Sequence, residues 1–418
     1  MRIDRLGEGG TPAEVLRALA DLATAQGTPP PAALIGDWFG RRALLAPSLL
    51  AVPVDPRDAF AAPPGRAAAG DRVGDDSIDG GRIGGGWIGY RAYPDLPTSG
   101  LTPALPEAAG GWTDSVLVQD ADGCWWYESL TDRPCPEQWA GAATRPRAHR
   151  RPWHIDWTAP DRDAHRHGVE QCLEAIRAGE VYQACVCTQF RGRTHGDPVD
   201  FFADAVEATR PARAAFVQGS WGAVASLSPE LYLARRQDRV SSSPIKGTLP
   251  VAADPALLRA SVKDIAENVM IVDLVRNDLG RLAVPGSVTV TDLLGVYPAP
   301  GVWHLVSTVE ATVPGGTTTG DLLDASFPPA SVTGCPKHRA RQLLSQWEPS
   351  PRGVYCGTVG FAAAHAGVEL NVAIRTVEFD SHGNATLGVG GGITIDSDPD
   401  AEWQECLDKA SSILALHH

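Results

Sequence analysis

The chain has 418 residues, with 36 basic and 50 acidic side chains, and its formal net charge is −14 at pH 7. This acidic excess argues against a nucleic-acid or anionic-membrane surface, because such surfaces need Lys and Arg to neutralise phosphates. No apolar run approaches the ~20 residues of a membrane span and the N-terminus has no recognisable signal peptide, so we expect a cytoplasmic globular protein.

The first 150 residues are expected to form an N-terminal region of mixed helix and strand. Apolar residues at helical spacing predict a helix over 11–25, with Thr11 as its N-cap. Residues 56–86 are rich in Gly, Pro, Asp and Ala without periodicity, which predicts an irregular loop. Alternating apolar residues on either side of a short turn predict a β-hairpin over 115–130. The polar, basic and proline-containing segment 141–152 is the best candidate for a linker.

A second region, residues 155–418, shows sharper patterns. It is expected to contain helices over 161–178, from Asp254-Pro255 to Gly280, and from Asp398-Pro399 to about Leu414. Strands are predicted at 181–190, 213–218, 222–227, 230–235, 286–291, 303–312, 354–364, 367–379 and 384–395. Because strands outnumber helices and short turns join them, we expect an α+β fold of mainly antiparallel sheets with helices packed outside. The two regions are expected to form one intertwined globule.

The eight cysteines show neither a CxxC pair nor a Cys/His spacing typical of a metal site. Cys185 and Cys187 would lie on one face of a strand, which suits burial better than metal binding. We expect reduced packing residues in a reducing compartment.

Lysine is unusually rare. The chain has four lysines, at 246, 263, 337 and 409, against 32 arginines. A lysine can lose its proton and act as a nucleophile, whereas a guanidinium cannot. Retention of Lys409 is compatible with chance, but Lys246 lies in the segment PIKGT (244–248) and is a candidate for chemistry.

Two predicted helices each carry a pair of carboxylates at i and i+3, which places the pair on one face. The pairs are Asp264 with Glu267, and Glu402 with Glu405. They could be solvated outer faces; if the two faces met, they would make an all-oxygen site suited to Mg²⁺. The glycine-rich run at 388–393 is either a turn or bulge, or a backbone nest for an anion.

Ten segments occur in a consistent order from about residue 160 to the C-terminus. They are YQ (182–183), SPE (228–230), PIKGT, the AEN…GR run (266–281), HLVS (304–307), TGCPK (333–337), YCGTVG (355–360), NVAIRT (371–376), GGGI (390–393) and the closing DSDP…E-x-x-E (396–405). In these motifs the chain resembles the chorismate-utilising enzymes, a family that includes anthranilate, aminodeoxychorismate, isochorismate and salicylate synthases. The first 150 residues match only loosely, as an N-terminal region like that of anthranilate synthase.

The resemblance implies two packed, mainly antiparallel β-sheets flanked by helices, with chorismate and Mg²⁺ in the cleft between them. It implies that Glu267 and Glu405 are Mg²⁺ ligands, assisted by Asp264 and Glu402. The substrate contacts that it implies are Gly247, Thr248, Tyr355, Arg375 and the amides of Gly390, Gly391 and Gly392.

Two positions distinguish the reactions of the family. Water-adding members have a lysine base where this chain has Gln183, and glutamine cannot act as a base. Aminodeoxychorismate synthases have a lysine at the position of Lys246, where anthranilate synthases have alanine. The resemblance therefore implies aminodeoxychorismate synthase component I, in which Lys246 attacks C2 of chorismate and ammonia then enters at C4, towards 4-aminobenzoate. Glu230 is the expected general acid/base, and His304 has a supporting role.

No segment of the sequence resembles a glutaminase site. The resemblance therefore implies that the chain uses free ammonia, or ammonia from a class I glutamine amidotransferase partner. Two alternatives remain: anthranilate synthase component I, and a non-catalytic relative with a regulatory or scaffolding role. The sequence leaves open the pathway that receives the product, the oligomeric state and any regulation by an aromatic amino acid.

Overall fold

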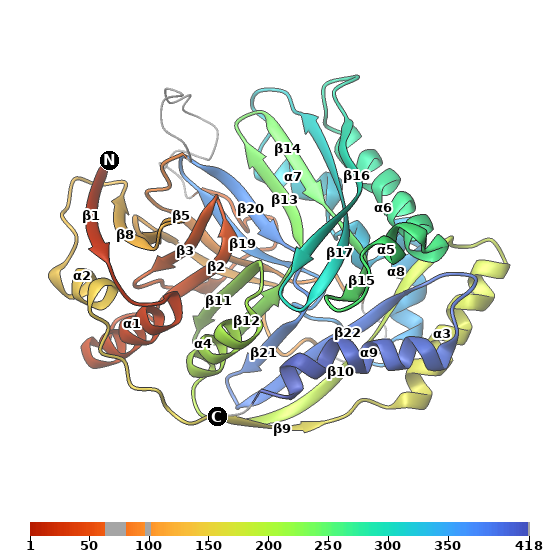
Figure 1. Cartoon of the computed structure of the whole chain (residues 1–418), viewed down its shortest axis with the longest axis horizontal. Coiled ribbons are helices and arrows are strands. Elements are labelled where there is room, and N and C mark those ends of the chain that lie inside the picture. The colour runs from red at the N-terminus through yellow and green to blue at the C-terminus, as the bar shows by residue number, and fades with distance from the viewer. Residues whose placement is uncertain (63–80, 97–101, 417–418) are drawn as a thin grey trace.

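The computed structural model describes residues 1–62, 81–96 and 102–416, and these form two large β-sheets (Figure 1). The first sheet has the order β1 (Arg2–Glu8), β8 (Cys124–Ser129), β7 (Ser115–Gln119), β3 (Arg41–Ala46), β2 (Ala32–Trp38), β11 (Arg213–Gly219), β12 (Gly222–Ser228), β21 (Thr376–Asp380), β22 (Asn384–Ile393), β10 (Gln183–His195) and β18 (Gly334–Cys335), and β9 (His154–Thr158) pairs with β10. The second has the order β15 (Ile245–Pro250), β17 (Val302–Thr312), β14 (Arg239–Ser243), β13 (Leu231–Arg236), β20 (Gly367–Asn371), β19 (Thr358–Ala363), β5 (Gly86–Arg91), β6 (Ala108–Thr113) and β4 (Val52–Pro53), and β16 (Thr289–Ala299) pairs with β17.

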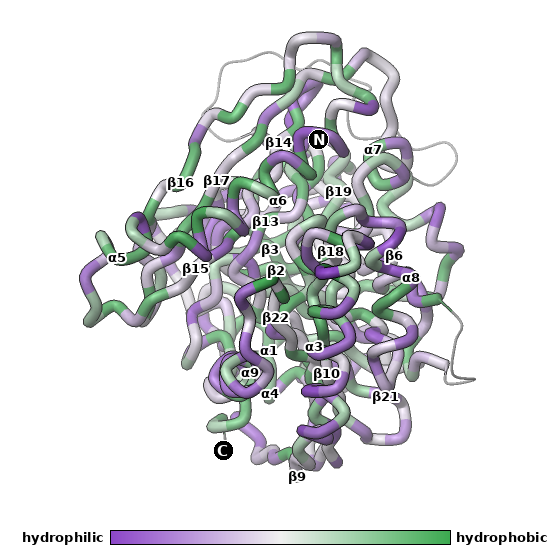
Figure 2. Tube along the Cα trace, turned by 90° about the vertical axis from the view of Figure 1, so that its right-hand side faces the viewer, coloured by the Kyte–Doolittle hydropathy of each residue, from purple (hydrophilic) through white to green (hydrophobic). Residues whose placement is uncertain are grey.

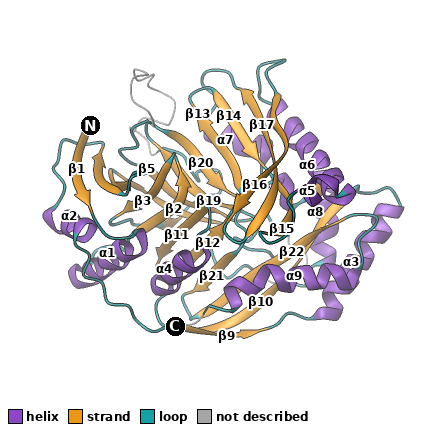
Figure 3. Ribbon diagram, viewed as in Figure 1, coloured by secondary structure: helices purple, strands orange, loops and turns teal. Residues whose placement is uncertain are grey.

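Helices cover the outer faces of the sheets (Figure 3). They are α1 (Pro12–Gln26), α2 (Glu137–Thr144), α3 (Arg162–Arg177), α4 (Pro198–Thr209), α5 (Ala256–Ala260), α6 (Val262–Gly280), α7 (Thr319–Ser326), α8 (Lys337–Trp347) and α9 (Pro399–Leu414), with a 3₁₀ turn at Ala330–Val332. In the first sheet α3 packs on β10 and α9 on β22, whereas α6 packs on β15 and β17 of the second. The strand pairs of the described residues are antiparallel, so the expected α+β fold with two mainly antiparallel sheets is confirmed.

The helix predicted at 11–25 is confirmed as α1, and its boundaries have local causes. The Thr11 side chain accepts a hydrogen bond from the Glu14 amide while the Glu14 side chain accepts one from the Thr11 amide, which completes a capping box. At the other end Gly27 adopts a left-handed conformation with φ of 63°. The hairpin predicted over 115–130 is also confirmed, as β7 and β8.

The long helix predicted from 254 to 280 is wrong, because the segment forms two helices. Ser261 has an extended conformation, with φ −74° and ψ 105°, between α5 and α6. Its side chain accepts a hydrogen bond from the Asp264 amide and so caps α6. A serine competes with helix continuation in this way, since its hydroxyl offers the backbone another partner. The new start places Asp264 in the first turn of α6.

The single strand predicted over 367–379 is also wrong. Strand β20 ends at Asn371 in the second sheet, and β21 begins at Thr376 in the first sheet. The chain crosses between the sheets over 372–375, where Arg375 has a positive φ of 52°. Asn371 fixes the crossing, since its side-chain amide donates to the Ser226 hydroxyl at 3.1 Å. Arg375 is thereby held at the junction of the two sheets.

Both sheets combine strands from the N-terminal region with strands from the rest of the chain. In the first sheet β2 pairs with β11, and Gly36 lies opposite Arg213. In the second sheet β5 pairs with β19, and Arg91 lies opposite Thr358. The cores on both sides of the sheets therefore contain residues from both parts of the chain.

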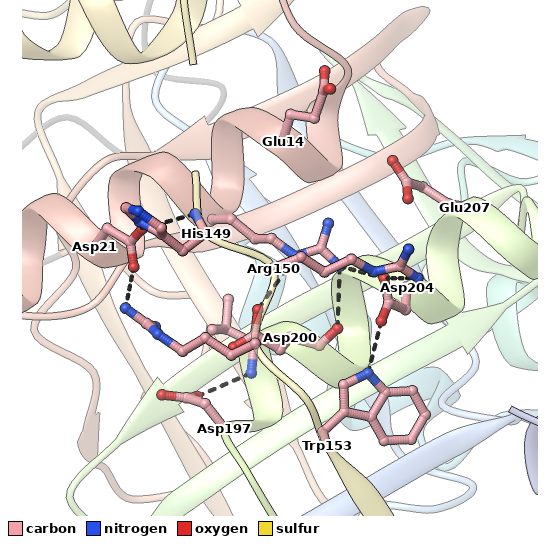
Figure 4. Close-up of polar contacts among 12 residues, drawn as sticks. Glu14, Asp21, His149, Arg150, Trp153, Asp197, Asp200, Asp204 and Glu207 are labelled. Carbon is pink, nitrogen blue, oxygen red and sulfur yellow. Dashed lines mark hydrogen bonds and ion pairs between the residues drawn. The ribbon is translucent and has the colours of Figure 1, made fainter. Parts of the chain in front are cut away.

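The segment proposed as a linker, 141–152, is held down by ion pairs (Figure 4). Its first residues, up to Thr144, complete α2. Arg150 pairs with Asp204 of α4 at 2.9 Å, and Arg151 pairs with Asp21 of α1. The same Asp204 accepts a hydrogen bond from the Trp153 indole at 2.8 Å and pairs with Arg17 of α1. The basic residues that suggested a linker are thus the partners of acidic groups on two helices.

The loop predicted over 56–86 lies partly outside the described residues, which omit 63–80; β5 begins at its last residue, Gly86.

The eight cysteines are all free, and Cys185 and Cys187 are buried with their sulfurs 3.9 Å apart. Among the described residues, no helix is long and apolar enough to cross a membrane.

Hydrophobic segments run along the central strands, while α5 projects from the body (Figure 2). Val251, Leu257 and Val262 around it are more than half exposed.

Candidate active site

Lys246 lies on β15 with its side chain 12% exposed. Its Nζ is 3.9 Å from Oε2 of Glu267 on α6. A Cβ atom added to Gly392 of β22 would lie 3.1 Å from the same Nζ, so a side chain at that position would displace the lysine. The Gln183 Oε1 atom borders the same space, 3.9 Å from that point, and is buried without a hydrogen-bond partner. Two strands of the first sheet, β10 and β22, therefore meet β15 of the second sheet and helix α6 around one amine.

Glu267 is buried on α6, the helix that packs against β15 and β17 of the second sheet. Burial raises the pKa of its carboxyl above the usual value, because a charged carboxylate loses hydration there. Lys246 and Lys263 oppose this rise, while the negative charges of Glu405 and Glu402 add to it. The two carboxylate pairs seen in the sequence thus act on each other electrostatically.

Glu402 and Glu405 lie in the first half of α9, which follows β22 directly. Glu402 is 2% exposed, and its Oε1 accepts hydrogen bonds from Lys263 at 3.1 Å and Ser397 at 2.7 Å. Its Oε2 is buried without a hydrogen-bond partner and lies 2.7 Å from the position of a Cβ on Gly391. Glu405 Oε1 lies 3.7 Å from the same position. The alternative that these pairs are solvated outer faces is wrong for Glu267 and Glu402.

Glu405 has a different electrostatic setting from Glu267. Burial raises the pKa of its carboxyl, but the charge and hydrogen bond of Lys409 together with the charges of Lys263 and Lys246 outweigh burial, so that the net shift of the pKa is downward. Lys409 Nζ lies 2.6 Å from the Glu405 carboxylate and donates to the Gly390 carbonyl at 2.8 Å. Lys409 therefore has a defined position beside the glycine run, and its retention in the sequence need not be attributed to chance.

The four carboxylates are suited to a hard divalent cation but do not surround a single point. No three of Asp264, Glu267, Glu402 and Glu405 bring oxygen atoms within 4.8 Å of one another. Asp264 lies apart from the α9 pair, packed against Gly247. The buried, unpartnered Oε2 of Glu402 and the buried carboxylate of Glu267 are nevertheless what a cation would satisfy, and oxygen donors suit Mg²⁺.

The glycine run at 388–393 is neither a turn nor a bulge. It forms the last part of β22 and pairs residue by residue with β10, with Gly390 opposite Cys187. The pairing of β22 with β21 ends at Leu387. The backbone N–H groups of 388–393 that point away from β10 are therefore not hydrogen-bonded to β21. Gly390 has a packing role too, since an added Cβ would lie 2.5 Å from the Cys187 sulfur.

Glu230 is buried in the connection between β12 and β13, with its amide bonded to the Ser228 hydroxyl. Burial raises the pKa of its carboxyl to about 7, and Ser331 and Lys246 oppose the rise. A cavity of about 20 Å³ beside it is also lined by Ser331 and Pro244 and has room for about one water. Near neutral pH this side chain exchanges a proton readily, as a general acid/base must.

His304, Arg375 and Tyr355 form a further group. His304 lies on β17 opposite Thr248 of β15, and the Thr248 hydroxyl is 3.0 Å from its Nδ1. Burial lowers the pKa of His304 to about 4, and the charge of Arg375 contributes. Burial also lowers the pKa of Arg375, while Tyr355 opposes this shift. The Tyr355 ring takes the space over Gly388, where a Cβ would lie 2.2 Å from it. The positive charge of Arg375 thus acts on His304, and a guanidinium can bind an anionic group bidentately.

Sequence reasoning missed Lys263, Ser397 and Lys409, which pair with the carboxylates. The scarcity of lysine in the sequence was a signal that could have found Lys263 and Lys409. In the structure all four lysines have an acidic partner within 4 Å, and three of those partners belong to the two carboxylate pairs.

Comparison with known proteins gives this site its context. Residues 62–415 match the family described as chorismate binding enzyme. The chain belongs to this family and is a chorismate-utilising enzyme. The aminodeoxychorismate synthase component 1 of Klebsiella aerogenes is 38% identical over 344 residues, which cover 79% of this chain and 76% of that protein.

Two anthranilate synthases are also similar. Component 1 from Streptomyces coelicolor is 32% identical over 369 residues, 79% of this chain and 71% of that protein. The crystal structure of component I from Streptococcus pneumoniae TIGR4 aligns with a TM-score of 0.69 at 25% identity, covering 82% of this chain and 83% of that chain. These similarities agree with the expected family.

Proposed function

We propose that this chain is an aminodeoxychorismate synthase that replaces the 4-hydroxyl group of chorismate with an amino group. The observation that carries the proposal is Lys246. It is one of four lysines in an arginine-rich chain, and its amine points into the space shared by Gly392, Gln183 and Glu267. A lysine can act there as a nucleophile, which neither arginine nor alanine can do. The greater identity to an aminodeoxychorismate synthase than to an anthranilate synthase is in line with this.

Chorismate carries two carboxylates, and the site offers two kinds of partner for them. Arg375 and Tyr355 bind one, because a guanidinium can bind a carboxylate bidentately. The amides of the run Gly390–Gly392 that face away from β10, with Gly247 and Thr248, receive the other. Glu267 and Glu405 would hold Mg²⁺, with Asp264 and Glu402 assisting. The ion would supply positive charge that stabilises the anionic substrate.

The reaction proceeds in two displacements. The Lys246 nitrogen forms a bond to C2 of the ring, the double bonds shift, and the C4 hydroxyl leaves as water with a proton from Glu230. Ammonia then forms a bond to C4, the bond from C2 to Lys246 breaks, and the lysine leaves as a neutral amine. A proton of the new ammonium group returns to Glu230, which restores the general acid. The sum is chorismate plus ammonia to 4-amino-4-deoxychorismate plus water, with the enolpyruvyl group retained. His304, which is neutral near pH 7, positions Thr248 beside the reacting ring.

A partner subunit supplies the ammonia. The similar Klebsiella protein is named component 1, and we extend this division of labour to the present chain. The partner that fits is a class I glutamine amidotransferase, whose product is ammonia.

The test is the product formed from chorismate, Mg²⁺ and ammonium. A product that keeps the enolpyruvyl group and yields 4-aminobenzoate when a lyase is added supports the proposal. Release of pyruvate and formation of 2-aminobenzoate would instead favour anthranilate synthase. No turnover with either nitrogen source, from protein that binds chorismate, would favour a non-catalytic relative.

A further inference from the structure

Two histidines and an aspartate meet on the paired strands β9 and β10. His154 lies directly opposite His195 in the strand register, and Asp156 lies two residues further along β9, on the same face. The two imidazole rings are stacked, with centroids 4.2 Å apart and planes 10° from parallel. Asp156 Oδ2 is 3.2 Å from His195 Nε2 and 3.9 Å from His154 Nε2.

This trio is separate from the candidate active site. Gln183 and His195 are the two ends of β10, and a strand of this length spans roughly 40 Å. β9 runs along the lower edge of the molecule in Figure 1, beneath β10.

The donor atoms lie close enough together to hold one metal ion. Within the part of the chain that the structure describes, this is the one group of three such residues whose donor atoms all lie within 4.8 Å of one another. Zn²⁺ binds imidazole nitrogen and carboxylate oxygen at about 2.0–2.2 Å, which separates tetrahedral ligand atoms by about 3.3 Å. To ligate one ion the two rings must turn out of their parallel stack so that their nitrogen lone pairs converge. They are free to do so, because each of the three side chains is more than half exposed.

The backbone that carries the donors is held firmly. Trp153, next to His154, is 3% exposed, packs edge-on against Phe201, and donates to Asp204. On the other strand the Thr194 amide donates to the Gly383 carbonyl at 2.9 Å. Donors placed on anchored strands reach a productive geometry more reproducibly than donors on loops.

We propose that His154, Asp156 and His195 form a binding site for Zn²⁺ or a first-row transition ion of similar preference. Two nitrogen donors disfavour Mg²⁺, so this site is independent of the carboxylate cluster. Three protein ligands leave a fourth position for water. The bound ion links the first residue of β9 to the last residue of β10 and so stabilises the point where the chain leaves the N-terminal region.

The test is calorimetric titration of the full chain with Zn²⁺ in excess Mg²⁺, which is added to compete for the carboxylate cluster. The chain ends in two further histidines, so all measurements use a background with His417→Ala and His418→Ala. This background should bind one equivalent of Zn²⁺, and Zn²⁺ should raise its thermal midpoint. Replacing His195 by alanine should weaken binding at least about tenfold and abolish the thermal shift. Replacing His338, an exposed histidine on α8, should change neither.

Two results would overturn the proposal. One is a His195→Ala and a His154→Ala variant that bind Zn²⁺ as tightly as the His338→Ala control. The other is a background protein with no saturable Zn²⁺ binding. Titration with Co²⁺ gives a second readout, since nitrogen-containing tetrahedral coordination produces strong visible absorption that should vanish in the His195→Ala variant.

Discussion

The amine nitrogen of Lys246 stands 3.9 Å from the carboxylate of Glu267, and both side chains are largely buried. This separation is longer than a hydrogen bond, so the two groups attract each other without a direct bond. The carboxylate therefore remains available to another cation, while the amine remains available to a substrate.

The first prediction concerns Glu267. Glu267→Gln keeps the size of the side chain but removes the charge, and it should lower turnover by about 100-fold or more while leaving the fold intact, because the loss of a metal-ligand charge is severe. Steady-state kinetics over a range of Mg²⁺ concentrations measure the effect. Glu170→Gln, at an exposed position on α3, is the matched control. Mg²⁺-dependent turnover within about threefold of wild type would remove Glu267 from the ligand set.

The second prediction concerns Lys246. Lys246→Arg should be inactive, since a guanidinium stays protonated and cannot attack C2. Lys246→Ala should lose the covalent adduct and keep at most slow direct amination. Intact-mass spectrometry of the wild type with chorismate and Mg²⁺, without ammonia, should show the adduct on the peptide that contains Lys246. Near-normal amination by the arginine variant, with no adduct trapped, would contradict the proposed nucleophile.

The third prediction follows from the raised pKa of Glu230, about 7. Glu230 donates its proton only when protonated, so turnover normalised to free ammonia should fall as pH rises through about 7. The folded protein prefers the neutral carboxyl, so the stability that this proton contributes is present at low pH and lost as pH rises through 7. Glu230→Gln should therefore raise the thermal midpoint more at pH 8 than at pH 5, besides lowering turnover. Equal shifts at the two pH values would mean that Glu230 is ionised throughout.

The fourth prediction concerns the nitrogen source. The purified chain should use ammonium at alkaline pH, where free ammonia is abundant, and should not use glutamine until an amidotransferase is added. Product formation is followed by mass. Glutamine-dependent turnover by the chain alone would reveal a glutaminase site within it.

The fifth prediction concerns the ion pairs of Figure 4. Arg17 is 6% exposed and pairs with Asp200 and Asp204. Arg17→Met leaves buried carboxylates without their partner and should lower the free energy of unfolding by about 3–5 kcal/mol. Arg150 pairs with Asp204 from an exposed position, so Arg150→Met should cost below about 1 kcal/mol. Urea denaturation measures both. Equal losses in the two variants would show that burial is not the deciding factor.

The sequence predicted α1, α3 and α9 well, because each begins with a side chain that caps it: Thr11, Asp161 and Asp398. The break between α5 and α6 was missed, since a serine within a helical pattern is usually read as a tolerated polar residue. The crossing at 372–375 was missed for another reason. Apolar residues alternate up to Ile374 and again from Val377, and the change of phase between them was passed over. Pairing with distant strands shows that the two halves belong to different sheets.

The candidate site was predicted as residue types but not as an arrangement. Spacing placed Glu402 and Glu405 on one face of a helix, and the structure adds that this face meets Gly391 and the lysines of α6 and α9. Such contacts depend on how two sheets pack, which local pattern does not encode. The roles of these residues in metal and substrate binding stay predictions.

The strand pairings have a consequence for how the protein is made. β5 cannot complete its ladder until β19 has been synthesised, since Arg91 pairs with Thr358. At about 5–20 residues per second, a ribosome takes roughly a quarter of a minute to a minute to cover that stretch. During this interval one edge of β5, with buried residues such as Trp87 and Ile88, lacks its native neighbour. Nascent chains should therefore bind chaperones until β19 emerges, and a slower ribosome should lengthen that dependence.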